Sequence, residues 1–228
     1  MGQEIELKLA CDGDIEWSAL VDALVSAGAE CSEQPKVDLS NTYYDTEDLA
    51  LHKAKAALRV RLSHDTWIQT FKTQGQSVDG LSRRGEWEWL LDSKELNTRV
   101  LSECPEWPSQ FPIYKLAPVF ETNFERQLML IAYQGLSIEL AFDKGLIVAG
   151  ARKEPINEIE LELKHEKGCE ARTDKSLDQA NAEEVQILLK LSAYLQKHLP
   201  LTPDDRSKAE RAYALYAQSS KSDSNGSS

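Results

Sequence analysis

The chain has 228 residues, of which 41% are hydrophobic, and its formal net charge is -12. This length suits one large domain or two small ones, and the acidic balance argues against general nucleic-acid or membrane-surface binding, because such sites present a basic face. The four cysteines and four histidines are dispersed without zinc-type spacing, so any metal should be a hard ion held by oxygen atoms. There is no apolar run long enough for a membrane span and no signal peptide, so we expect a cytoplasmic protein.

Alternation of apolar and polar residues predicts strands along most of the chain. The predicted elements are a strand at 3–9, a helix ending near residue 28, a strand at 37–44, a hairpin over 56–73, a polar loop at 75–80, a strand at 82–91, loop and short helices at 93–113, strands at 116–122, 124–130, 137–143, 146–149 and 157–164, a long helix from about 185 to 200 and a helix at 207–217. Their short connections predict mostly antiparallel pairing.

Three local patterns complete these predictions. Lys144-Gly145 predicts a hairpin turn between two strands. Asp204 or Asp205 is expected to cap the last helix. From residue 219 the chain is Ser-rich, which predicts a disordered polar tail over 219–228 after a single domain over 1–218.

Several predicted strands carry charged side chains on one face and apolar side chains on the other, which favours a closed sheet with its charged face inward. By strand parity the inward cations are Lys8, Arg59, Arg61, Lys72, Arg84 and Arg126, and the inward carboxylates are Glu4, Glu6, Glu86, Glu88, Asp143, Glu158, Glu160 and Glu162. The cations suit phosphate groups. The carboxylates suit Mg²⁺ or Mn²⁺, which would neutralise phosphate charge and activate a water molecule.

A simpler interpretation stays open for each strand taken alone. Arg59 and Arg61, for example, could face water on an open sheet. The triplet of Glu158, Glu160 and Glu162 is harder to explain in this way, because like charges on one face repel unless cations lie nearby. The sequence contains no Walker loop, dinucleotide-binding glycine motif or catalytic triad that would favour a different chemistry.

The Glu4-Ile5-Glu6-Leu7-Lys8 stretch resembles the ExExK signature of the CYTH domain, in the triphosphate tunnel metalloenzyme superfamily. The resemblance continues in order over almost the whole chain, at Tyr43-Tyr44-Asp45-Thr46, Leu58-Arg59-Val60-Arg61, Phe71-Lys72, residues 84–88, Arg126, Phe142-Asp143, Glu158-Ile159-Glu160 and Ser207-Lys208. The sequence looks most like the bacterial inorganic triphosphatases of this family, although its strand around Arg126 is less basic than in many members.

The resemblance implies an α+β fold, an eight-stranded antiparallel β-barrel, or tunnel, with a charged lumen and surrounding helices. It also implies an enzyme that hydrolyses inorganic triphosphate to pyrophosphate and phosphate with Mg²⁺ or Mn²⁺. Five residues fall at metal-binding positions, Glu4, Glu6, Asp143, Glu158 and Glu160. Six fall at phosphate-binding positions, Lys8, Arg59, Arg61, Lys72, Arg126 and Lys208.

Within this set we assign catalytic roles to Lys8, Glu6 and Lys72, the last as a group that helps to activate water. Strand parity adds Arg84 as a substrate-binding residue, and Glu86 and Glu162 as metal-binding residues. The resemblance also predicts that the helix carrying Lys208 lines or plugs one mouth of the tunnel.

Other functions remain open from the sequence. A class IV adenylate cyclase or a thiamine triphosphatase would share the signature, and a non-catalytic sensor of polyphosphate or nucleotide could keep only the cations. Among the candidates for a base pocket, Trp67, Trp87 and Trp89, the last two lie opposite the glutamates by parity, where they would pack against helices. We expect a small-molecule triphosphate substrate, no nucleic acid or membrane partner, and a monomer or homodimer. Some bacterial triphosphatases carry a histidine-rich helical domain after this one, so the sequence leaves open a stand-alone or a longer form.

Overall fold

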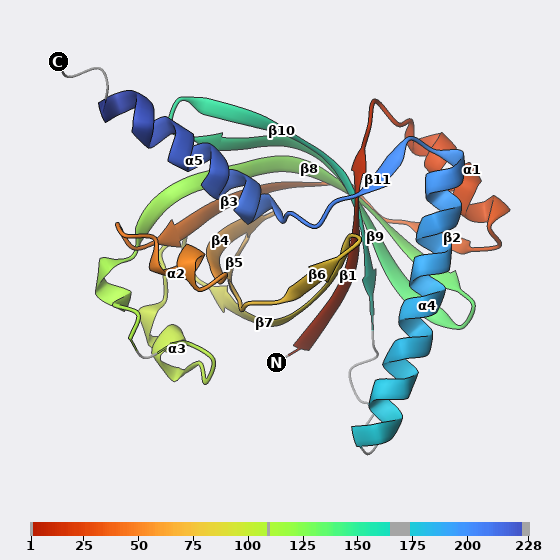
Figure 1. Ribbon diagram of the computed structural model, residues 1–228, viewed down its shortest axis with the longest axis horizontal. Helices are drawn as coiled ribbons and strands as arrows, with labels where there is room; N and C mark the ends of the chain where they lie inside the picture. The colour runs from red at the N-terminus through yellow and green to blue at the C-terminus, as the bar shows by residue number, and fades with distance from the viewer. Residues whose placement is uncertain (1, 109, 165–173, 225–228) are drawn as a thin grey trace.

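The computed structural model describes residues 2–108, 110–164 and 174–224. Within these residues, eight antiparallel strands close into a barrel, because β1 pairs with β10 on one side and with β7 on the other (Figure 1). In order around the ring they are β1 (Gly2–Cys11), β10 (Arg152–Leu163), β9 (Leu136–Ala149), β8 (Ala117–Tyr133), β3 (Val37–Asp45), β4 (Ala57–Ser63), β5 (Thr66–Lys72) and β7 (Leu81–Leu91). This confirms the predicted closed sheet.

Three short strands extend this sheet and helices surround it (Figure 1). The strands are β2 (Glu30–Glu33) beside β8, β6 (Gln76–Val78) beside β7 and β11 (Leu201–Pro203) beside β1. The helices are α1 (Trp17–Ser26), α2 (Ala50–Lys53), α3 (Thr98–Glu103), the 3₁₀-helix η1 (Ile113–Lys115), α4 (Asp174–His198) and α5 (Lys208–Ser224). Among the described helices, none is long and apolar enough to cross a membrane.

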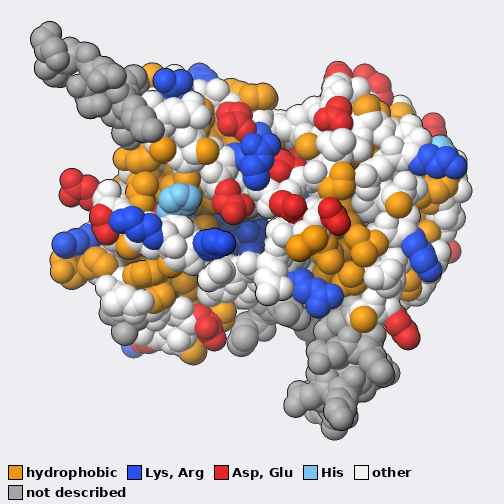
Figure 2. All heavy atoms as spheres, viewed as in Figure 1, with side chains coloured by type: hydrophobic (Ala, Val, Ile, Leu, Met, Phe, Trp, Pro, Cys, Tyr) orange, Lys and Arg blue, Asp and Glu red, His pale blue; other side chains and the backbone are white. Residues whose placement is uncertain are grey.

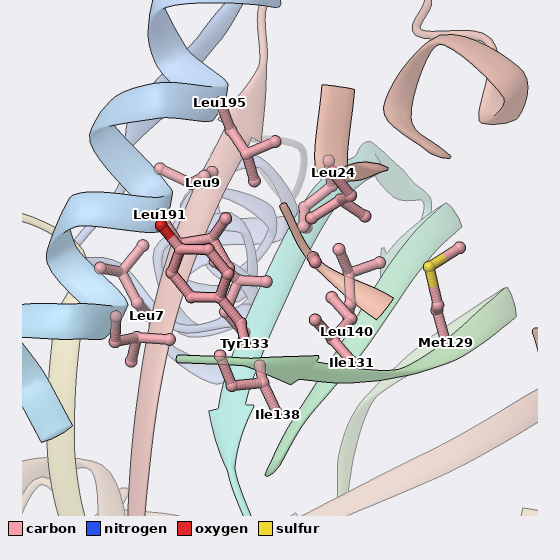
Figure 3. Packing of buried hydrophobic residues seen from close by; sticks show 14 of the residues in the cluster. Leu7, Leu9, Leu24, Met129, Ile131, Tyr133, Ile138, Leu140, Leu191 and Leu195 are labelled. Atoms are coloured by element: carbon pink, nitrogen blue, oxygen red, sulfur yellow. The ribbon is translucent and has the colours of Figure 1, made fainter. Parts of the chain in front are cut away.

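The main hydrophobic core lies outside the barrel, between its wall and the helices α1 and α4 (Figure 3). Leu7 and Leu9 on β1 are fully buried and pack in the same cluster as Leu191 and Leu195 on α4. These strand residues alternate with charged ones that face the opposite side of the sheet. Burial of the apolar face therefore directs the charged face into the barrel.

One end of the barrel interior is apolar and is filled by α5. Phe124 on β8 and Ile156 on β10 share strand faces with Arg126 and Glu158, and they pack in one cluster with Ala212 of α5. The interior is thus divided along its axis into an apolar part beneath α5 and a charged part. This arrangement confirms that the Lys208 helix lines the tunnel.

The predicted hairpin turn at Lys144-Gly145 is wrong, because β9 continues through both residues. The turn instead falls at Gln134-Gly135, where both residues have positive φ, between β8 and β9. Gly145 serves a different purpose, because a Cβ there would lie 2.2 Å from the Asn123 carbonyl oxygen. A glycine within a strand is typical of such a close backbone approach.

A Gly145→Ala variant should therefore be destabilised by about 1–3 kcal/mol, the usual effect of overpacking a well-packed site. Gly135→Asn is the matched control, because Gly135 has a positive φ that asparagine tolerates, and a Cβ added there would meet no heavy atom within 4 Å. Urea unfolding of both variants measures the difference. Equal midpoints for Gly145→Ala and the wild type would contradict the close approach.

The ends of α5 differ from the prediction. Ser207 caps the helix: its hydroxyl accepts a hydrogen bond from the Glu210 backbone N–H, and the Glu210 carboxylate accepts one from the Ser207 N–H. This reciprocal pair is a capping box, whereas Asp204 accepts from the Arg206 N–H and Asp205 from the Gly80 N–H. The helix runs to Ser224, so residues 219–224 are helical and not a disordered tail, while 225–228 lie outside the described residues.

Candidate active site

The charged part of the barrel encloses a cavity of about 260 Å³. Most of the predicted site residues line it, namely Glu4, Glu6, Lys8, Arg59, Arg61, Lys72, Arg84, Glu86, Glu88, Arg126, Glu160, Glu162 and Lys208. The two remaining predicted residues, Asp143 and Glu158, lie directly beside it in contact with Lys208. The structure therefore gathers the whole predicted set around one space, which the open-sheet alternative does not allow.

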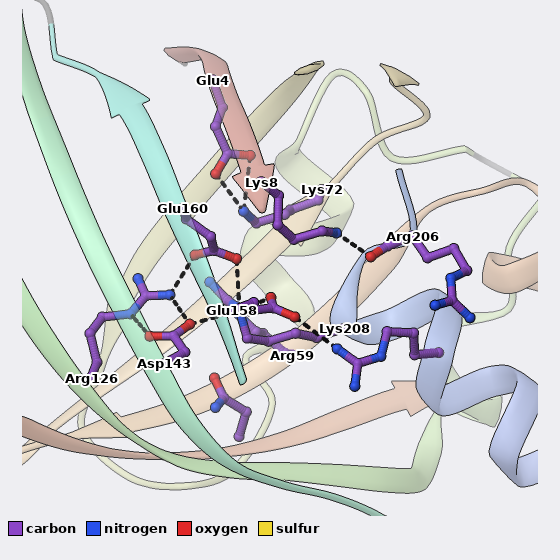
Figure 4. Close-up of polar contacts among 12 residues, drawn as sticks. Glu4, Lys8, Arg59, Lys72, Arg126, Asp143, Glu158, Glu160, Arg206 and Lys208 are labelled. Carbon is purple, nitrogen blue, oxygen red and sulfur yellow. Dashed lines mark hydrogen bonds and ion pairs between the residues drawn. The ribbon is translucent and has the colours of Figure 1, made fainter. Parts of the chain in front are cut away.

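Three carboxylates form the group best suited to hold a metal ion among the described residues (Figure 4). One oxygen from each of Asp143, Glu158 and Glu160 lies within 4.8 Å of the other two. They meet because Asp143 on β9 is opposite Glu158 on β10, and Glu160 follows on the same face. Hard divalent cations prefer oxygen ligands of this kind, so the donor set fits Mg²⁺ or Mn²⁺.

Cations from two neighbouring elements neutralise this carboxylate group (Figure 4). The Lys208 Nζ lies 2.7 Å from Asp143, 2.6 Å from Glu158 and 2.7 Å from Glu160. Arg126 donates to both oxygens of Asp143, at 2.7 and 2.6 Å, and to Glu160 at 2.6 Å. Burial alone would raise the pKa of Glu160, but Lys208 and Arg126 outweigh it and hold that pKa well below its usual value.

Glu4 and Glu86 lie in a second charged group, formed with residues of β5 and β7. The Lys72 Nζ lies 2.8 Å from Glu4 and 3.1 Å from Glu86, and the Arg84 Nε donates to Glu4 at 2.8 Å. Burial opposes ionisation of Glu4, but Lys72 and Arg84 outweigh it and lower its pKa. The predicted metal residues thus fall into separate groups.

Glu162, also a predicted metal residue, belongs to neither group. Its carboxylate lies 2.8 Å from the Nζ of Lys164, which also lies 3.3 Å from Glu139. Glu88, which strand parity places inward, accepts a hydrogen bond from the Thr70 hydroxyl at 3.2 Å. Both glutamates therefore line the cavity with partners of their own.

Glu6 differs from the other tunnel carboxylates, since no side chain or backbone group among the described residues bonds to it or pairs with it. Burial and the nearby carboxylates of Glu160 and Glu4 raise its pKa to about 7. An ionised Glu6 is consequently unfavourable until a cation approaches. This buried, unpartnered carboxyl is a second observation that fits a metal ion in the tunnel.

A Glu6→Gln variant should melt at a higher temperature than the wild type at pH 8 in chelator. The wild-type Glu6 pKa is about 7 when folded against 4.5 for an unperturbed group, so the folded state loses stability as pH rises from about 4.5 through 7. A shift of this size corresponds to about 3 kcal/mol, or several degrees. At pH 5 the two melting temperatures should converge; a difference that does not depend on pH would contradict the raised pKa.

Three cations that line the cavity, Lys8 on β1 and Arg59 and Arg61 on β4, lack close carboxylate partners among the described residues. The Lys8 Nζ donates to the backbone oxygen of Arg206 and forms no ion pair (Figure 4). The Arg59 Nε is buried without a hydrogen-bond partner, and its guanidinium comes no nearer than 3.9 Å to Glu86. A buried donor without an acceptor, such as the Arg59 Nε, is costly. The orientation of these cations into the cavity is therefore typical of a site for an anionic ligand.

Arg61 shows the same excess of positive charge. Its Nε donates to the Asn41 side chain at 2.8 Å, but it forms no ion pair within the described part of the chain. Burial, together with the charges of Arg59 and Arg126, lowers its pKa to about 9. A bound phosphate group would relieve this repulsion.

Sequence reasoning missed several charged residues of the site. Arg211 donates to Glu154 at 2.7 Å and to Glu158 at 2.8 Å, and its position three residues after Lys208 on a helix would have indicated a shared face. Lys164 continues the strand parity of the preceding glutamates. Tyr43 also lines the cavity, where Arg59 and Arg61 lower its pKa although burial acts in the opposite direction.

The fold and the site together define a tunnel protein, a closed antiparallel barrel whose interior holds both carboxylates and cations. The chain belongs to the CYTH domain family, whose model matches residues 2–213. It is 40% identical over 164 residues to an inorganic triphosphatase of Haemophilus influenzae, which covers 72% of this chain and 46% of that protein. The chain thus spans less than half the length of this curated relative.

Solved structures share the fold at low sequence identity. A putative adenylyl cyclase from Hippeastrum, described as having a dominant triphosphatase activity, superposes with a TM-score of 0.55 at 19% identity over 95% of this chain and 96% of that one. The PH1819 protein of Pyrococcus horikoshii gives 0.53 at 17% identity over 92% and 98%. These similarities confirm the tunnel fold.

Proposed function

We propose that the protein hydrolyses inorganic triphosphate to pyrophosphate and phosphate inside the tunnel, in a reaction that depends on Mg²⁺ or Mn²⁺. The observation that carries this proposal is the division of the cavity: Lys8, Arg59 and Arg61 lack close carboxylate partners, whereas Asp143, Glu158 and Glu160 form a carboxylate group. A small polyanion would pair with these cations, and a divalent cation would bind the carboxylates that Lys208 and Arg126 neutralise in its absence. The similarity to the Haemophilus triphosphatase supports the same substrate.

Asp143, Glu158 and Glu160 would hold the metal ion, with Glu4 and Glu6 as further ligands from β1. When bound, the ion supplies charge neutralisation on the phosphate oxygens and makes a water molecule more acidic. Phosphoryl transfer requires mainly positioning and charge stabilisation. No nucleophilic serine or cysteine is therefore needed in this site.

The side chains of the tunnel account for binding and orientation. Lys8, Arg59 and Arg61 bind the phosphate oxygens, and Lys8 stabilises the charge that develops as water attacks a terminal phosphorus and pyrophosphate leaves. Lys72 is fixed by Glu4 and Glu86. We assign to Lys72 the orientation of the attacking water, and to Arg84 and Arg126 the support of the carboxylates beside the substrate.

The proposal is tested by phosphate release from inorganic triphosphate, ATP and thiamine triphosphate in parallel, each with Mg²⁺, Mn²⁺ or chelator. We expect fast release from inorganic triphosphate that disappears in chelator. Release mainly from ATP or thiamine triphosphate would assign the tunnel to a different substrate. Formation of cyclic AMP from ATP would identify a cyclase, and tight triphosphate binding without turnover would identify a sensor.

A further inference from the structure

A second cavity opens directly from the tunnel and is larger than the first. Its volume is about 540 Å³ against about 260 Å³, and the two share the lining residues Glu6, Lys8, Lys72 and Arg84. We call it the vestibule. It lies between α2, β6 and the segment that leads into α5, where Figure 2 shows a hollow with Lys and Arg side chains at its base. Ligand atoms that extend beyond the tunnel would enter this space.

The charges that line the vestibule favour an anion. Three of its four carboxylates already have partners: Asp204 accepts from Arg206, Asp205 from Ser77 and Gly80, and Glu210 from the Ser207 N–H, whereas Glu6, at the junction with the tunnel, has none among the described residues. Among the lining cations, Lys55 forms no ion pair within the described chain and Lys53 only a 3.5 Å contact with Asp48 at the surface. Lys53 and Lys55 therefore leave positive charge available in the part of the vestibule next to α2.

The turn that carries these lysines is held in place before any ligand arrives. Asp45 is fully buried and accepts hydrogen bonds from the backbone N–H groups of Leu51 and His52, at 2.9 and 3.0 Å, and from the Tyr213 hydroxyl at 2.8 Å. This carboxylate thereby joins α2 to α5. A preformed rim loses little entropy when it binds a ligand.

The vestibule offers little to a nucleoside base. Its aromatic lining residues are His52 and Tyr213, which stack on each other with centroids 4.1 Å apart. Tyr213 is buried, and its edge contacts Phe120. His52 is exposed, but one face of its ring is already covered by Tyr213, whereas a phosphate chain requires only the cations.

We infer that the vestibule holds the phosphates beyond the third of a linear polyphosphate, with Lys53 and Lys55 as its binding cations. This inference rests on the proposed function, since the first three phosphates occupy the tunnel. A chain longer than triphosphate would continue from Lys8 along the wall toward α2. The protein would then act on tetraphosphate and longer chains as well as on triphosphate.

The test compares a Lys53→Gln/Lys55→Gln variant with a Lys94→Gln/Lys115→Gln control, which loses the same charge at exposed positions outside both cavities. The rim variant should lose about fivefold in kcat/KM for tetraphosphate, because exposed ion pairs are individually weak, and keep its kcat/KM for triphosphate. Equal losses for both substrates, no loss beyond the control, or a loss confined to ATP would overturn the inference.

Melting temperatures separate this inference from the proposed function. If the wild type hydrolyses no triphosphate, the proposed function fails. Binding in the vestibule can still be tested, because a bound tetraphosphate raises the melting temperature by mass action. A larger upward shift of the melting temperature in the wild type than in the rim variant supports the vestibule. Equal shifts in both proteins would overturn it.

Discussion

A Lys8→Ala variant is expected to lose at least about 100-fold in kcat/KM for inorganic triphosphate, comparable to the loss of a preorganised charge-stabilising donor. Lys8 is only 5% exposed, and its Nζ bonds to a backbone oxygen, with no carboxylate within ion-pair distance among the described residues. Its charge is therefore available to the substrate. Initial rates of phosphate release at several triphosphate concentrations give kcat/KM for the variant and the wild type.

The matched control is Lys36→Ala, which removes an equal charge from an exposed residue that pairs with Glu125 on the outside of the barrel. We expect the control to keep wild-type activity and the Lys8 variant to keep its melting temperature within a few degrees, since no ion pair is broken. Turnover near that of the wild type in Lys8→Ala would remove Lys8 from the site. A large drop in melting temperature would show that Lys8 is mainly structural.

The second large effect is expected for Asp143→Asn. Asp143 is fully buried and lies between Arg126 and Lys208 at the centre of the carboxylate group. Asparagine preserves the shape but removes one negative charge from the proposed metal site. Activity should fall by about 100-fold or more, a loss comparable to that of a preorganised electrostatic group, and the rise in melting temperature that we expect Mg²⁺ to cause in the wild type should be absent.

Glu125→Gln is the control for this variant, because it removes a carboxylate from the exposed face of the neighbouring strand β8. Because breaking a buried ion pair by itself destabilises by about 3–5 kcal/mol, the Mg²⁺-induced shift is the more informative readout. A shift in Asp143→Asn as large as in the wild type would place the metal ion elsewhere in the tunnel.

Strand parity predicted well which charged side chains line the cavity, because charged and apolar faces alternate strictly where the barrel wall is backed by helices. Glu158 and Glu160 face the lumen while Ile159 and Leu161 are fully buried on the other side. Trp87 similarly lies opposite the glutamates of β7 and packs with the cluster that contains Leu101 of α3, as the sequence indicated. In this part of the barrel, one face of each strand points into the lumen and the other packs against the outer helices.

Parity was less informative where the buried face changes along a strand. On β8, Phe120 and Phe124 are buried inside the barrel beneath α5, whereas Met129 and Ile131 are buried outside against the helical layer. The sequence therefore read as two separate strands. A helix that enters the barrel end creates this change through long-range packing, and a local pattern of residues does not reveal it.

The partners of the charged residues also depend on long-range packing. Arg211 was missed because its contacts with Glu154 and Glu158 follow from the position of α5 across the barrel end. The unpartnered state of Glu6 is equally a property of the closed sheet, since the neighbours that raise its pKa come from its own strand and from β10. Sequence reasoning located Glu6 but could not show that it lacks a partner, and it did not place Arg211 in the site.

Titration of Mg²⁺ into chelator-stripped protein, with phosphate release from inorganic triphosphate as the readout, tests the central claim most directly. A tunnel in which unpaired cations bind triphosphate beside a carboxylate group should be inactive without the ion and should regain activity in one saturable transition. The same titration of Asp143→Asn should remain flat or shift to much higher Mg²⁺. Full activity in the stripped wild-type protein, or no triphosphate hydrolysis at any Mg²⁺ concentration, would contradict the account.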